Sequence, residues 1–97
     1  MFLSMGALLL LLAGAAIVTV AVITYKKIKA YLNNLRIKSA VTRFVALHNA
    51  GNEQHVYAGL FDNEQNSIPE ATAFKGKSID DETRHYLPEE EVILLDV

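Results

Sequence analysis

The feature that most constrains the fold is an uncharged stretch near the N-terminus, residues 2–24, built mainly from Leu, Ala, Val and Ile. A helix rises about 1.5 Å per residue, so this stretch would reach roughly 34 Å, and the hydrocarbon core of a membrane is about 30 Å thick. We therefore predict that residues 1–25 form a single transmembrane helix.

A cleaved signal peptide is the alternative interpretation of the same stretch. Such a peptide has basic residues before its apolar core, and that core is about 7–15 residues long. Here no basic side chain precedes the apolar stretch, and Lys26, Lys27 and Lys29 follow it directly. This order favours an anchor that is not cleaved.

Charge is divided unevenly along the chain, and this division sets the predicted orientation. Residues 1–51 contain six basic and no acidic side chains, whereas residues 52–97 contain all 11 acidic side chains and the other three of the nine basic ones. Positive charges next to a membrane span stay on the cytoplasmic side. We therefore expect the N-terminus outside and the C-terminal domain in the cytoplasm.

Residues 26–40 are predicted to continue the membrane helix as a basic juxtamembrane helix, because apolar residues recur there at helical spacing. The basic side chains are candidate ligands for anionic lipid headgroups, at about 1 kcal/mol each. The simpler interpretation is that they only set the topology. The candidate headgroup ligands are Lys26, Lys27, Lys29, Arg36 and Lys38.

Small residues recur every seven positions in the predicted membrane helix, at Ala7, Gly14 and Ala21. Small side chains let two helices approach closely in lipid, so this stripe is a candidate helix–helix contact and favours a homo-oligomer. The alternative interpretation is that Ala and Gly are simply common in membrane helices.

Beyond residue 40 the pattern changes to short apolar runs separated by turn residues. This pattern predicts a small, acidic α+β domain, mostly of antiparallel strands, over residues 41–97. Strands are expected over residues 41–48, 55–61, 68–74 and 91–97.

The first two of these strands are expected to form a hairpin around the turn-rich stretch that separates them. Pro69 marks the third as an edge strand, because proline cannot donate to a sheet. Ser78 is expected to cap a short helix that ends at Leu87, before Pro88.

The last expected strand is apolar at four consecutive positions, residues 92–95, where a strand with one wet face would alternate. It should therefore be central in the sheet or covered by a partner. The candidate partner contacts are Ile93, Leu94 and Leu95.

The histidines are the first place to look for chemistry. His48 and His55 flank the hairpin turn and could face each other, with a third metal ligand from Glu53, Asp62 or His85. No recognised metal-binding spacing, nucleophile motif or phosphate loop accompanies them. We therefore expect no catalytic residue, metal, cofactor or small-molecule substrate, and we do not expect an enzyme.

These features favour an accessory or structural subunit, anchored in a membrane, whose small domain makes protein–protein contacts at the cytoplasmic face. One alternative is a structural protein of an internal virion membrane that contacts the capsid. Another is a sensor that binds anionic lipid or a ligand through the basic residues beside the membrane. Membrane lipids and other protein subunits are the expected partners, and nucleic acid is not expected.

Overall fold

The computed structural model describes residues 4–12, 15–35, 42–61 and 68–95. Within these residues, no helix is both long enough and apolar enough to cross a membrane. The predicted transmembrane helix over residues 1–25 is therefore wrong, and so is the orientation with the N-terminus outside and the domain in the cytoplasm. The expected small α+β domain of mostly antiparallel strands is present.

The uncharged N-terminal stretch divides into short elements instead of one helix. Helix α1 (Met5–Leu11) begins at Ser4, whose hydroxyl accepts the N–H of Ala7 at 3.1 Å. Strand β1 (Ala16–Thr19) and strand β2 (Val22–Ile23) follow. The second part of the stretch is rich in the β-branched residues Val, Ile and Thr, which favour strands.

The basic segment forms helix α2 (Tyr25–Asn34), shorter than the helix expected over residues 26–40. It does not continue a preceding helix, because Thr24 has extended backbone and caps it by accepting the N–H of Lys27. Its apolar side chains recur at helical spacing and pack against the sheet. They are Ile28, Leu32 and the capping residue Leu35, all buried.

The predicted hairpin is confirmed. Strand β3 (Thr42–Ala50) pairs antiparallel with strand β4 (Glu53–Phe61), and Ala50 lies opposite Glu53. Gly51 begins the two-residue turn at a φ of 67°, a conformation that glycine adopts without steric cost.

Strand β5 (Glu70–Gly76) pairs antiparallel with β4, close to the position expected from residues 68–74. It is not an edge strand, because β1 pairs with its other side in parallel. Pro69 instead lies just before the strand begins. The short strand β6 (Ser78–Ile79) pairs in parallel with β2.

Helix α3 (Asp81–Tyr86) begins two residues later than expected. Ser78 lies in β6, and the capping residue is Asp80, whose side chain accepts the N–H of Thr83 at 3.0 Å. The helix ends at Leu87, as expected. The last strand, β7 (Val92–Leu95), pairs antiparallel with β3.

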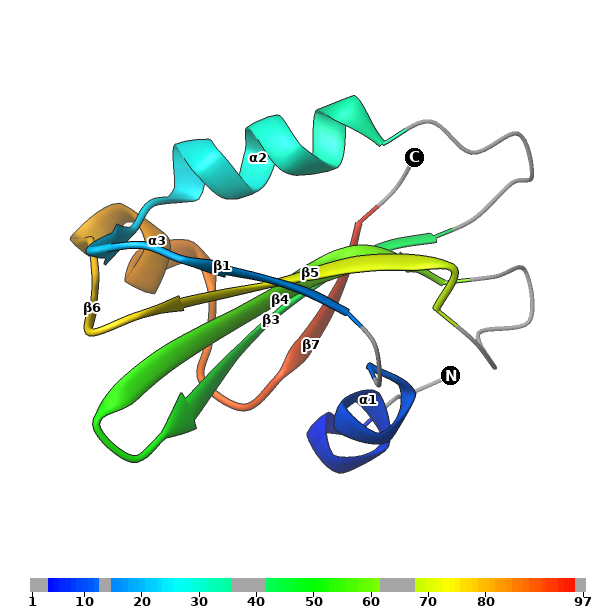
Figure 1. Cartoon of the computed structure of the whole chain (residues 1–97), viewed down its shortest axis with the longest axis horizontal. Helices are drawn as coiled ribbons and strands as arrows, with labels where there is room; N and C mark the ends of the chain where they lie inside the picture. Colours follow the sequence, from blue (N-terminus) through cyan, green and yellow to red (C-terminus); the bar gives the residue numbers. More distant parts are fainter. Residues whose placement is uncertain (1–3, 13–14, 36–41, 62–67, 96–97) are drawn as a thin grey trace.

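The main sheet has the order β1-β5-β4-β3-β7, with helices on both faces (Figure 1). Helix α2 covers one face, where its apolar residues join Val45, Val56 and Phe74 in one core. Helix α1 covers the other face, where Leu8 packs with Phe44 and Phe61 in a second core. These two faces are called the α2 face and the α1 face below.

Candidate functional site

Strand β1 is an uncovered edge of the main sheet. Its one partner among the described residues is β5, so its other side carries free backbone groups. All four of its residues are exposed, and the apolar side chains of Ile17 and Val18 are 61% and 40% exposed. Proteins usually protect such an edge with a charge, a proline or a bulge, and β1 has no charged residue or proline.

Exposed apolar residues of α1 lie beside this edge. Leu10 is 82% exposed, and Leu9 lines an open groove of about 260 Å³ together with Ile17. The far wall of this groove is formed by Tyr57, Ala73 and Lys75. The surface formed by α1 and β1 is therefore apolar along most of its length, with one cation at its end.

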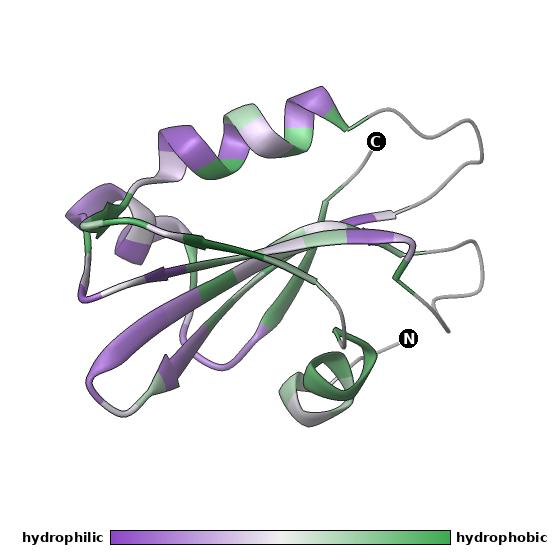
Figure 2. Ribbon diagram, in the orientation of Figure 1, coloured by the Kyte–Doolittle hydropathy of each residue, from purple (hydrophilic) through white to green (hydrophobic). Residues whose placement is uncertain are grey.

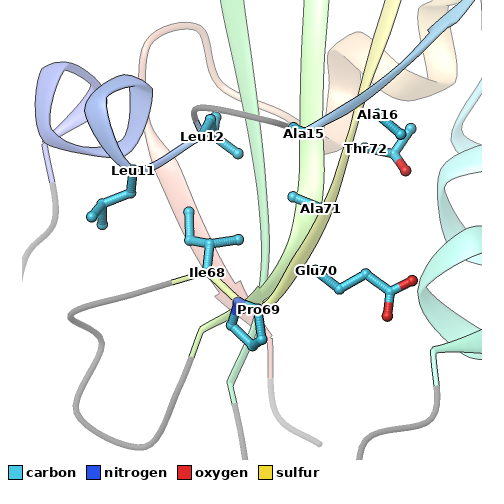
Figure 3. A pocket seen from close by; sticks show the side chains of 9 residues that line it. All are labelled: Leu11, Leu12, Ala15, Ala16, Ile68, Pro69, Glu70, Ala71 and Thr72. Carbon is cyan, nitrogen blue, oxygen red and sulfur yellow. The ribbon is translucent and has the colours of Figure 1, made fainter.

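A second hollow, of about 400 Å³, lies where the chain passes from α1 to β1 (Figure 3). Leu12, Ile68 and Pro69 form its apolar wall beside the first residues of β5. The side chain of Glu70 points away from that wall. The edge at β1 thus has a hollow with one apolar wall at its beginning and a groove along its α1 face.

A cluster of three rings lies on the α1 face at the hairpin end of the sheet. His48 and His55 are cross-strand partners, as expected, with ring centroids 6.2 Å apart, and Tyr57 stacks 6.4 Å from His48. The carboxylate of Glu90 accepts a hydrogen bond from Nδ1 of His48 at 2.8 Å. This bond and the N–H of Asn49 hold the pKa of Glu90 below its ordinary value.

His55 is buried between two side chains of its own strand. Its Nδ1 lies 3.1 Å from the hydroxyl of Tyr57, and its Nε2 lies 3.6 Å from a carboxylate oxygen of Glu53, beyond a good hydrogen bond. Burial, and then the charge of Glu90, raise the pKa of Tyr57. The hydroxyl of Tyr57 therefore stays protonated at neutral pH.

This cluster does not form a metal site within the described part of the chain. No group of three or more His, Asp or Glu side chains there could hold a metal ion. Of the three candidate third ligands, Glu53 lies near His55, His85 lies on α3 beside Tyr86, and Asp62 falls outside the described residues. The ring cluster is best explained as a structural contact between β3, β4 and the segment before β7.

The candidate headgroup ligands on α2 are exposed. Lys26, Lys27 and Lys29 lie on the solvent side of the helix, while Arg36 and Lys38 fall outside the described residues. Tyr25, at the beginning of α2, stacks on Tyr86 of α3 with ring centroids 4.8 Å apart. Lipid binding by these lysines stays a prediction.

The stripe of small residues is not on one helix. Ala7 lies in α1, Ala21 lies between β1 and β2, and Gly14 falls outside the described residues. The candidate partner contacts lie in β7, where Ile93 and Leu95 pack against the core of the α2 face and Leu94 is 40% exposed. Partner contact by these residues also stays a prediction.

Three structural features were missed from the sequence: the β1 edge, the Glu90 contact and the ring pair of Tyr25 and Tyr86. The β-branched run in residues 17–24 was the available signal for the first. No family model matches the chain, and no curated protein or solved structure is similar to it at a significant level.

Proposed function

We propose that this protein is an accessory or structural protein that acts through protein–protein contacts, and that β1 with the exposed side of α1 is its contact surface. The observation that supports this most directly is the exposure of Ile17 and Val18 on an unpaired sheet edge. An added strand would satisfy the free backbone groups and cover these side chains. Contiguous exposed apolar surface of this kind marks interaction sites in folded proteins.

Lipid binding by α2 has weaker support. The apolar side of the helix is already buried against the sheet, so it cannot enter a bilayer. The three described lysines would then act through charge alone, at about 1 kcal/mol each. A total of about 3 kcal/mol corresponds to a dissociation constant above 1 mM.

The proposed function is tested by purifying the tagged protein from its source cells with two single variants. Ile17→Lys places a charge on the β1 edge, and Tyr86→Lys places the same charge on α3, where Tyr86 is also exposed. We expect Ile17→Lys to lose proteins that co-purify with the wild type, and Tyr86→Lys to keep them. Retention of the same proteins by Ile17→Lys would contradict the proposal.

A further inference from the structure

We draw no further inference here: the strongest candidate, the pair of apolar edges at which β1 and β7 end the main sheet (Figure 2), carries nothing, because the β1 edge belongs to the contact surface already described and nothing in the described part of the chain shows what covers the β7 edge.

Discussion

The carboxylate of Glu90 and Nδ1 of His48 lie 2.8 Å apart and join the segment before β7 to the end of β3. The N–H of Asn49 donates to the other carboxylate oxygen at 2.8 Å, and Glu90 itself donates to Leu47. Glu90 has a φ of 60°, which a residue other than glycine adopts only where its surroundings hold it. These contacts fix where β7 begins.

The Glu90 contact should make stability depend on pH. The hydrogen bond from His48, and then that from Asn49, lower the pKa of Glu90 from its ordinary value of 4.5. A lowered folded-state pKa contributes stability above the unfolded-state pKa, and this contribution is lost as the pH falls through the folded-state pKa. We expect Glu90→Gln to destabilise the protein at pH 6 and to have a smaller effect near pH 3, measured by urea unfolding.

Glu91→Gln is the matched control for this prediction, because Glu91 is exposed and has no ion pair among the described residues. It should unfold like the wild type at both pH values. A Glu90→Gln effect of equal size at pH 6 and pH 3 would mean that the carboxylate charge is not what fixes this segment.

The local pattern predicted the hairpin well, because its strands are long and its turn is short. Residues 51 and 52 form the turn between two strands that contain β-branched and aromatic residues, so nearby residues decide the pairing of His48 with His55. The contact of His48 with Glu90 spans 42 positions, and no local pattern indicates it.

The prediction for the N-terminal stretch was wrong because hydropathy alone does not separate a membrane helix from several short helices and strands that follow one another. Residues 17–24 contain seven β-branched residues among eight, which favours strands, but a membrane helix tolerates them too. Whether this stretch forms one helix or several short elements is decided by residues that are distant in the sequence. Strand β5 pairs with β1, and Phe44 and Phe61 pack against Leu8.

Packing of α1 on the sheet can be tested at two leucines of the same helix. Leu8 is fully buried, whereas Leu10 is 82% exposed. We expect Leu8→Ala to lower the free energy of unfolding by about 2–5 kcal/mol. Leu10→Ala should change it by less than about 0.5 kcal/mol. Equal effects in chemical denaturation would show that α1 does not rest on the α1 face.

Gly59 marks a close approach between β4 and β5. A Cβ at this position would lie 2.7 and 2.8 Å from atoms of Ala71, and closer still to the carbonyl oxygen of Glu70. We expect Gly59→Ala to destabilise the protein by about 1–3 kcal/mol, because backbone must move to admit the methyl group. The urea concentration at the midpoint of unfolding measures this loss of stability.

Gly6 provides the control for that substitution, because a Cβ there would meet no atom within 4 Å. Gly6→Ala should stabilise the protein by about 0.5–1 kcal/mol, since alanine is the better helix former. If both substitutions changed the free energy of unfolding in the same direction, the close approach of Gly59 to β5 would be wrong.

The cap of α3 distinguishes the observed helix start from the one expected from the sequence. Asp80 accepts the N–H of Thr83, whereas Ser78 is exposed in β6. We expect Asp80→Ala to cost about 1 kcal/mol of stability, as loss of a helix cap does, and Ser78→Ala to cost almost nothing. The reverse ranking in thermal unfolding would restore Ser78 as the cap.

Strand β7 has side chains that pack against the core beside one that is exposed. Ile93 is partly buried and packs against the core of the α2 face, so a carboxylate there would lie among apolar side chains. We expect Ile93→Asp to unfold the protein, and Leu94→Asp to leave it folded. Circular dichroism during urea unfolding measures both effects.

Leu94→Asp is the matched control for Ile93→Asp, because it places the same charge on the next residue of the strand, where the side chain is exposed. A folded Ile93→Asp variant would show that β7 does not pack on the α2 face. Unfolding of both variants to the same extent would show that the two sides of β7 do not differ in burial.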